Sequence, residues 1–291
     1  MKVDRILLGW LLLLLFFSFF ISLRIDLIRE RKDKISYPSR QLPRLTKNNL
    51  PNLTAKSYLV MDADSGLVLA KKNPYLRLNP ASITKMVTAI SSLESFPLDE
   101  VITIKEEYPV GKNMELQPGE KMTIENLIYG LIVHSANDAA FVLAGQTQPK
   151  IDAFVNRMNN FVKQLGLNDT NFENFDGEDD KNHYSTAYDL AHIARFALKN
   201  KVFYQSIRRQ EMTVTDVSGE IEHHLETTNE LLSQLPEVKG IKTGWTPEAG
   251  ECFIGLIELG GKEFITVILG SEDRFGETKK LITWLKGSLE I

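Results

Sequence analysis

Three short motifs together have the residue types of a nucleophilic serine site: Ser82-Ile-Thr-Lys85, Ser135-Ala-Asn137 and Lys242-Thr-Gly244. A serine hydroxyl is a poor nucleophile unless a neighbouring group takes its proton, and a lysine can do so only as a neutral amine. The pattern therefore predicts a serine nucleophile whose base is a lysine rather than a histidine. Each motif alone is common by chance, so the prediction depends on all three standing in this order.

Ser82 and Lys85 are the predicted nucleophile and base. Pro80 stands just before a helical pattern, which places Ser82 in the first turn of a helix and Lys85 three residues on, on the same face. Burial and a second cation each lower a lysine pKa, and Lys242 supplies that cation if its strand lies beside the helix. Read alone, the pair also fits a helix cap followed by a solvated lysine.

The second motif joins one apolar helical pattern to the next, so we expect Ser135 and Asn137 on a turn that faces a cleft. Ser135 can relay a proton toward a leaving amine, and Asn137 can hold a substrate amide and orient Lys85. As an isolated tripeptide the motif also fits a helix cap, because serine and asparagine favour such positions.

The third motif, within Gly240-Ile-Lys-Thr-Gly-Trp245, reads as a strand whose glycine lets another backbone approach closely. This edge can bind an extended peptide, with Lys242 and Thr243 facing a substrate carboxylate. The backbone N–H groups of Ser82 and Trp245, which follows Gly244, are the predicted oxyanion hole. The alternative is a surface turn and strand with a solvated lysine.

The elements that must position these motifs have a simple order. Apolar runs at 57–61 and 66–70 predict a β-hairpin, and runs at 251–259 and 263–270 predict two late strands. Helical spacing of apolar residues predicts helices from 83, at 124–133, 139–146, 151–165 and 187–198, and a last helix at 277–289. Strands at both ends around a helical middle predict an α+β fold with an antiparallel sheet.

Composition excludes several other classes of protein. The 291 residues are 43% apolar and 25% charged, with a net charge of −4, which is typical of a globular chain without a basic face for nucleic acid. The histidines show no metal-ligand spacing, so the sequence predicts no metal and no cofactor, and we expect the histidines to be structural or solvated. Cys252 is the single cysteine and is expected to pack as a small core residue.

The N-terminus predicts a membrane anchor. After a short flank at 1–5, residues 6–23 are almost entirely apolar and as a helix reach about 27 Å, close to the thickness of a bilayer core. The absence of a clear small-residue cleavage site favours a retained anchor over a cleaved signal peptide. Residues 24–55 read as a tether, and 56–291 as the catalytic domain.

Two features of the sequence predict opposite orientations of the domain in the membrane. More basic residues follow the apolar segment than precede it, so the positive-inside rule would keep the domain in the cytoplasm. The chemistry described next requires the outer side, and acidic residues interrupt the basic run. We therefore expect a single-pass cell-membrane protein with an extracytoplasmic domain.

The chain resembles the serine D-alanyl-D-alanine carboxypeptidases, which are low-molecular-weight penicillin-binding proteins with a β-lactamase/transpeptidase-like fold. The resemblance runs from about 55 to 285 and rests on segments that flank the motifs as well as on the motifs themselves. Those segments are Asn79-Pro-Ala-Ser-Ile-Thr-Lys-Met-Val-Thr-Ala, Leu116-Gln-Pro-Gly-Glu-Lys-Met-Thr, Ser135-Ala-Asn-Asp-Ala-Ala, His183-Tyr-Ser-Thr-Ala and Lys242-Thr-Gly-Trp-Thr-Pro-Glu-Ala-Gly.

The resemblance implies removal of the terminal D-alanine from peptidoglycan stem peptides through an acyl-enzyme on Ser82, with β-lactams as covalent inhibitors. It further implies that Arg274 helps to hold the terminal carboxylate and that His183 holds a loop. Alternatives are a DD-endopeptidase that cuts cross-links, a class A β-lactamase, and a catalytically silent peptidoglycan-binding module. The segment 174–183 departs from the family's usual turn, and we expect its acidic residues to form a solvated loop.

Overall fold

The computed structural model describes residues 42–46, 49–146 and 151–290. A compact unit begins at Pro43 and includes every predicted site residue. The predicted anchor at 6–23 lies outside the described residues. Within the described part of the chain, no helix is long and apolar enough to cross a membrane.

The centre of the unit is a five-stranded antiparallel sheet in the order β3-β2-β10-β9-β8. The strands are β2 (Ser57–Asp62), β3 (Val68–Lys72), β8 (Val238–Thr246), β9 (Gly250–Leu259) and β10 (Lys262–Ser271). The first two strands pair with the last three through β2 and β10, so the early and late segments complete one sheet. The predicted α+β fold with an antiparallel sheet is confirmed, and β8 forms an edge of that sheet.

Both faces of the sheet are covered, which explains why its strands read as continuous apolar runs. Side chains alternate between two apolar clusters along each strand. In β2, Leu59 and Met61 belong to the core under the helices, whereas Tyr58 and Val60 belong to the core under the last helix. Cys252 is fully buried in the first of these cores, as the sequence predicted.

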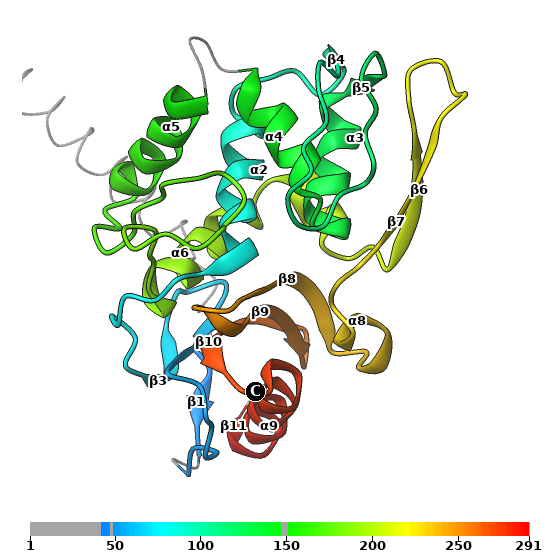
Figure 1. Cartoon of the computed structure of the whole chain (residues 1–291). Coiled ribbons are helices and arrows are strands. Elements are labelled where there is room, and N and C mark those ends of the chain that lie inside the picture. The colour runs from blue at the N-terminus through cyan, green and yellow to red at the C-terminus, as the bar shows by residue number, and fades with distance from the viewer. Residues whose placement is uncertain (1–41, 47–48, 147–150, 291) are drawn as a thin grey trace, which may run out of the picture. The chain divides into compact units, whose positions relative to one another are not determined.

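A helical layer covers one face of the sheet, and α9 (Arg274–Ser288) lies on the other side (Figure 1). The larger layer holds α2 (Lys85–Leu93), α3 (Ile124–Tyr129), a short π-helical turn η2 (Gly130–His134), α4 (Asn137–Gly145), α5 (Ile151–Gln164), α6 (Ala187–Ala197) and α7 (Lys201–Ser206). A single turn, α8 (Leu231–Gln234), precedes β8. The predicted helices are confirmed to within a few residues at each end.

Two small antiparallel sheets interrupt the helical middle and were not predicted. They are β4 (Val101–Thr103) with β5 (Lys121–Thr123), and β6 (Glu211–Thr215) with β7 (Glu222–Glu226). The second projects from the body as a hairpin (Figure 1). These strands have few apolar residues and lie at the surface, so their sequences lack the sustained alternation that identifies a half-buried strand.

The compact unit also includes part of the segment expected to be a tether. The two-residue strands β1 (Arg44–Leu45) and β11 (Leu289–Glu290) pair with each other. Leu53 and Ala55 are buried in the core beside α9. The compact unit therefore begins ahead of residue 56, where the sequence placed the domain boundary.

Candidate active site

The first motif spans a helical turn and the start of a helix. Ser82 lies in the 3-10 turn η1 (Ala81–Thr84), and Lys85 is the first residue of α2. Lys85 Nζ donates to Ser82 Oγ at 2.9 Å, so the predicted nucleophile and the predicted base are in direct contact. Ala81 has φ = 51°, a left-handed conformation that is uncommon outside glycine and clusters at functional sites.

Burial controls the protonation of Lys85. The residue is 1% exposed, and desolvation lowers the pKa of its amine from 10.5 to about 8. The carboxylates of Asp176, Glu178 and Asp138 act in the opposite direction and limit the lowering of this pKa. A useful fraction of Lys85 is therefore neutral near neutral pH, as a base for Ser82 must be.

The second motif forms the turn between η2 and α4. Ser135 closes η2 in the left-handed region, with φ = 63°, and its Oγ accepts a hydrogen bond from Lys242 Nζ at 2.7 Å. Asn137 begins α4, and its Nδ2 donates to Glu178 Oε1 over a long 3.4 Å. Among the hydrogen bonds of the described residues, none joins Asn137 to Lys85, so Asn137 does not orient Lys85 here in the predicted way.

The third motif supplies the second lysine of the site. Lys242 lies on β8 and is 1% exposed. Burial lowers the pKa of its amine well below 10.5, and the positive charges of Lys85, Lys112 and Arg274 lower it further. The positive charge of Lys85 thus contributes to the lowered pKa of Lys242, whereas the pKa of Lys85 itself is lowered by burial and not by Lys242 as the sequence predicted.

The remaining predicted residues lie around this pair. A Cβ added to Gly244 would stand 2.9 Å from the carbonyl oxygen of Pro80 and 3.2 Å from Ser82 N, so the strand touches the backbone of the nucleophile as predicted. Thr243 Oγ1 lies 2.5 Å from Thr228 Oγ1. Trp245 is 59% exposed and is an apolar surface next to the motif.

Arg274, the first residue of α9, also reaches the third motif. Its Nη1 donates to the carbonyl oxygen of Gly244 at 2.9 Å, and its backbone N–H donates to Glu251. Its Nε is buried without a hydrogen-bond partner among the described residues. The structure therefore brings all nine predicted site residues to one place.

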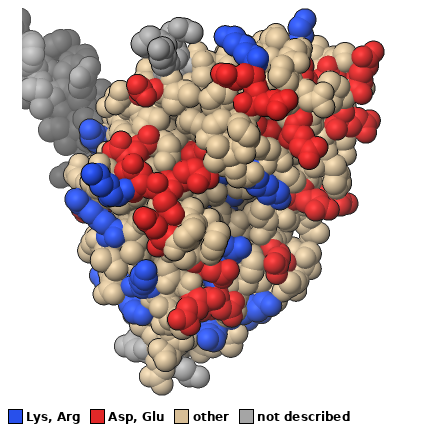
Figure 2. All heavy atoms as spheres, viewed as in Figure 1, with Lys and Arg blue, Asp and Glu red and all other residues tan. Residues whose placement is uncertain are grey.

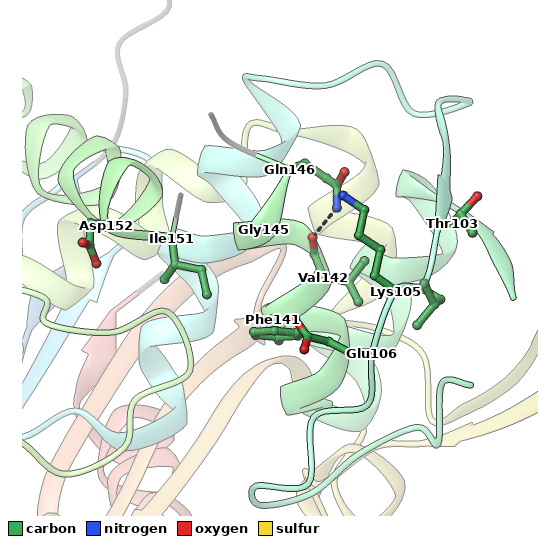
Figure 3. A pocket seen from close by; sticks show the side chains of 10 residues that line it. Thr103, Lys105, Glu106, Phe141, Val142, Gly145, Gln146, Ile151 and Asp152 are labelled. Atoms are coloured by element: carbon green, nitrogen blue, oxygen red, sulfur yellow. Dashed lines mark hydrogen bonds between the residues drawn. The ribbon is translucent and has the colours of Figure 1, made fainter. Parts of the chain in front are cut away.

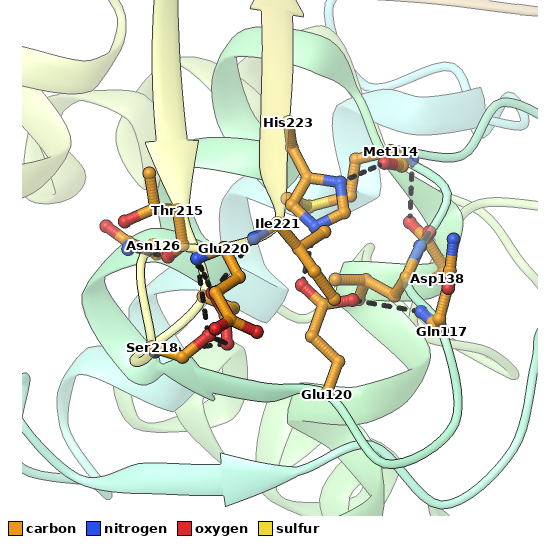
Figure 4. A network of polar contacts seen from close by, with 12 residues as sticks. Met114, Gln117, Glu120, Asn126, Asp138, Thr215, Ser218, Glu220, Ile221 and His223 are labelled. Carbon is orange, nitrogen blue, oxygen red and sulfur yellow. Dashed lines mark hydrogen bonds and ion pairs between the residues drawn. The ribbon is translucent and has the colours of Figure 1, made fainter.

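A polar network supports the second motif from behind, and the sequence did not predict it (Figure 4). Asp138, next to Asn137, accepts from the backbone N–H groups of Met114 and Leu116 at 3.1 and 3.0 Å. Both ring nitrogens of buried His223 face oxygen atoms, the Met114 carbonyl at 2.7 Å and Glu120 Oε1 at 2.5 Å. The hairpin residue His223 thus holds the loop that fixes the turn of the second motif.

The acidic segment 174–179 corrects one expectation, because it is not simply a solvated loop. Asp176 is 2% exposed and accepts from Tyr108 Oη at 2.8 Å. Asp179 accepts from Asn79 Nδ2 at 2.5 Å and from Thr246 Oγ1 at 2.6 Å. The segment joins the first and third motifs, and the one sign of this in the sequence is the glycine at 177.

His183 has the structural role that the sequence predicted. Its Nε2 lies 2.8 Å from Thr84 Oγ1, and its Nδ1 accepts from the backbone N–H of Glu173 at 3.2 Å. Burial lowers the pKa of His183 from 6.5 to about 4. The ring is therefore neutral at neutral pH and ties the loop to the residue two positions after Ser82.

Figure 2 shows the charges on this face of the molecule, where acidic side chains gather on the helical half around a central hollow that contains basic side chains. A different hollow of about 340 Å³ lies between α4 and the segment after β4, lined by Phe141, Val142 and Ile151 among others (Figure 3). None of the predicted site residues lines it. In the described residues, no group of His, Cys, Asp and Glu could hold a metal ion.

Comparison with known proteins agrees with this geometry. The family model described as D-alanyl-D-alanine carboxypeptidase, of the S11 peptidases, matches residues 44–273. The chain belongs to this family. It is 34% identical over 241 residues to D-alanyl-D-alanine carboxypeptidase DacF of Bacillus subtilis and 33% identical over 252 residues to DacA of Escherichia coli K12.

The alignments differ in how much of each relative they include. They cover 78% and 81% of this chain but 61% of DacF and of DacA, so the chain spans about three fifths of the length of these relatives. The crystal structure of the Streptomyces K15 DD-transpeptidase matches at a TM-score of 0.78 and 30% identity, covering 82% of this chain and 100% of that chain. Family and fold are thus shown by sequence and by structure.

Proposed function

We propose that this protein is a serine D-alanyl-D-alanine carboxypeptidase that removes the terminal D-alanine from peptidoglycan stem peptides. One observation carries the proposal: Lys85 Nζ donates to Ser82 Oγ at 2.9 Å inside the cleft where Lys242 Nζ donates to Ser135 Oγ at 2.7 Å. A serine in contact with a lysine of lowered pKa has the partner that nucleophilic attack requires.

In the proposed reaction, Ser82 Oγ attacks the carbonyl carbon of the penultimate D-alanine while neutral Lys85 takes its proton. The tetrahedral intermediate then expels the amine of the terminal D-alanine, which takes a proton from Lys242 through Ser135. The proton that Lys85 removed from Ser82 then passes to Lys242, so both lysines return to their starting states. The acyl group remains as an ester on Ser82. Ser135 is suited to this relay because its hydrogen-bond partner is the amine of Lys242, and the lowered pKa of that amine makes it a better proton donor.

The other site residues bind substrate in this proposal. The N–H groups of Ser82 and Trp245 stabilise the developing oxyanion, which is consistent with the contact between Gly244 and the Ser82 backbone. Asn137 donates to a substrate amide, while Lys242, Thr243 and Arg274 attract the terminal carboxylate. The buried Arg274 Nε without a partner is a donor available for that carboxylate, directly or through water.

The membrane anchor and the location belong to the same proposal. Residues 6–23 are apolar over about the thickness of a bilayer core, and stem peptides lie outside the cytoplasmic membrane. We therefore propose a single-pass protein whose catalytic unit faces the cell wall. Alkaline phosphatase or a similar reporter, fused after Ile291 and active in intact cells, tests this orientation; an inactive fusion that is expressed contradicts it.

Two measurements test the activity. Incubation with penicillin should add the mass of one penicillin to the intact protein, and the Ser82→Ala variant should show no adduct. Incubation with purified muropeptides should release free D-alanine, whereas cleavage of cross-linked dimers without free D-alanine would indicate an endopeptidase. A folded wild-type protein that forms no adduct would rule out the serine mechanism.

A further inference from the structure

The segment 174–179 is fastened to the elements that carry the first and third motifs. Asp179 accepts from Asn79, just before η1, and from Thr246, the last residue of β8. Within the segment, Asn174 Oδ1 accepts from Gly177 N at 2.8 Å, and Asn174 Nδ2 donates to the carbonyl oxygen of Glu178 at 2.9 Å. These contacts hold Gly177 and Glu178 in one position relative to the cleft.

Gly177 lies directly against the nucleophile. A Cβ built on Gly177 would stand 2.0 Å from the carbonyl oxygen of Ala81 and 2.9 Å from Ser82 N. The backbone of Gly177 is therefore in van der Waals contact with the turn that carries Ser82. The next residue, Glu178, begins within a few ångströms of the same turn.

The Glu178 carboxylate extends from there to the second motif. Its Oε1 lies 3.4 Å from Asn137 Nδ2. Its charge also raises the pKa of Lys85, which places the carboxylate within electrostatic reach of that amine. The Glu178 carboxylate thus lies beside the side chain expected to hold the substrate amide and within electrostatic reach of the predicted base, on the residue that follows the contact with the turn of Ser82.

Glu178 differs in solvent exposure from the other two carboxylates that raise the pKa of Lys85. Asp176 is buried and accepts from Tyr108, and Asp138 is buried and accepts from backbone N–H groups of the loop after Tyr108. Glu178 is exposed to solvent. It is the carboxylate of these three that a water molecule can reach without displacing a hydrogen bond inside the protein.

We propose that Glu178 is a catalytic residue that activates the water which hydrolyses the acyl-enzyme on Ser82. This inference rests on the proposed function and adds the group responsible for its second half. Glu178 sets the fate of the ester, because hydrolysis requires a deprotonated water whereas acylation does not. An acyl-enzyme without this base persists until another nucleophile attacks it.

The step conserves atoms and charge. The water oxygen bonds to the acyl carbon while one of its protons goes to the Glu178 carboxylate. Glu178 passes this proton to the amine of Lys85, and the resulting ammonium gives it to Ser82 Oγ as the bond between the acyl carbon and Oγ breaks. The product is a free carboxylic acid, and Ser82, Lys85 and Glu178 return to their starting states.

The test separates the two halves of the reaction on the full chain. A fluorescent penicillin measures acylation of Ser82, and a chase with excess unlabelled penicillin measures loss of the label. In Glu178→Gln the acylation rate should stay within a few-fold of wild type, because the amide oxygen still accepts from Asn137. Deacylation should slow by about 100-fold, the low end of the usual contribution of a general base.

A matched control comes from the same segment of chain. Glu173 is exposed, its Oε1 accepts from Asn171 Nδ2 at 2.9 Å, and it is not one of the charges that shift the pKa of Lys85. Glu173→Gln removes the same charge from the loop and should acylate and deacylate at wild-type rates. An equal slowing in both variants would show an effect of net loop charge and would overturn the proposal.

Three further outcomes would also contradict the proposal. Wild-type deacylation in Glu178→Gln excludes Glu178 as the base. Equal losses of acylation and deacylation show that Glu178 positions Asn137 or tunes Lys85 and does not activate water. A wild-type chain that penicillin never acylates overturns the proposed function itself and this inference with it, so failure of the parent proposal is recognised by the missing first step.

Discussion

Gly177→Ala tests whether the contact between the acidic segment and the nucleophile matters for activity. The residue has φ = 93°, a conformation that alanine disfavours by about 1–2 kcal/mol. The added Cβ would also stand 2.0 Å from the carbonyl oxygen of Ala81, inside van der Waals contact with rigid backbone. Relief of such overpacking typically costs a further ~1–3 kcal/mol.

Together these two effects predict a loss of about 3 kcal/mol in the free energy of unfolding. For a domain of this size that lowers the melting temperature by roughly 6–12 °C. The segment or the turn must also move by about an ångström, and such displacement of a reacting group can cost about 100-fold in rate. We therefore expect Gly177→Ala to be acylated by penicillin about 100-fold more slowly than wild type.

Gly219→Ala is the matched control for backbone strain. Gly219 has φ = 76°, but a Cβ there would meet nothing within 4 Å. This variant should lose only the conformational part, about 1–2 kcal/mol, and should be acylated at the wild-type rate. Equal melting temperatures for the two variants, or wild-type acylation of Gly177→Ala, would refute the claim that this contact shapes the site.

Two more predictions follow from the pKa values of buried groups. Because neutral Lys85 is the proposed base and its pKa is about 8, the acylation rate should rise about tenfold per pH unit up to about pH 8 and then level off. Lys85→Arg should abolish acylation at every pH, since a guanidinium keeps its proton, whereas wild-type acylation by this variant would exclude Lys85 as the base. His183 has its pKa lowered to about 4 in the folded protein, so the unfolded chain binds the extra proton between pH 6.5 and 4. The free energy of unfolding should therefore fall by about 3 kcal/mol as the pH drops through that window. The melting temperatures of wild type and His183→Gln should converge as the pH approaches 4. Parallel curves of melting temperature against pH would contradict this account.

The chemistry of the motifs could be read from the sequence because it depends on residue type and close spacing. Lys85 follows Ser82 by three positions, so a helical start places them on one face wherever that helix packs. The strands β2, β9 and β10 of the central sheet were predicted for a similar reason. Both of their faces are buried, and uninterrupted apolar runs record that burial directly.

Contacts between polar groups far apart in the chain could not be read in this way. The pairing of His223 with Glu120 joins a surface hairpin to a loop a hundred positions earlier, and neither residue has a local pattern that names the other. The sequence placed Asp176 in a solvated charge run. In the structure Asp176 is buried, and Tyr108 compensates for its desolvation by donating a hydrogen bond to the carboxylate. Charge in a sequence predicts exposure only until a distant partner compensates for desolvation.

The sequence by itself therefore determined the candidate reactive groups and the kind of elements that carry them: Ser82 with Lys85 on a helix, Ser135 with Asn137 on a turn, and Lys242 on a strand. Only the tertiary structure decided that β8 lies against the turn of Ser82 and that Lys242 meets Ser135. It also decided that the exposed Glu178 lies beside Asn137. The reason is physical: reactivity and helical spacing are local properties, whereas desolvation and the pKa values that follow from it depend on what the rest of the chain packs around each group.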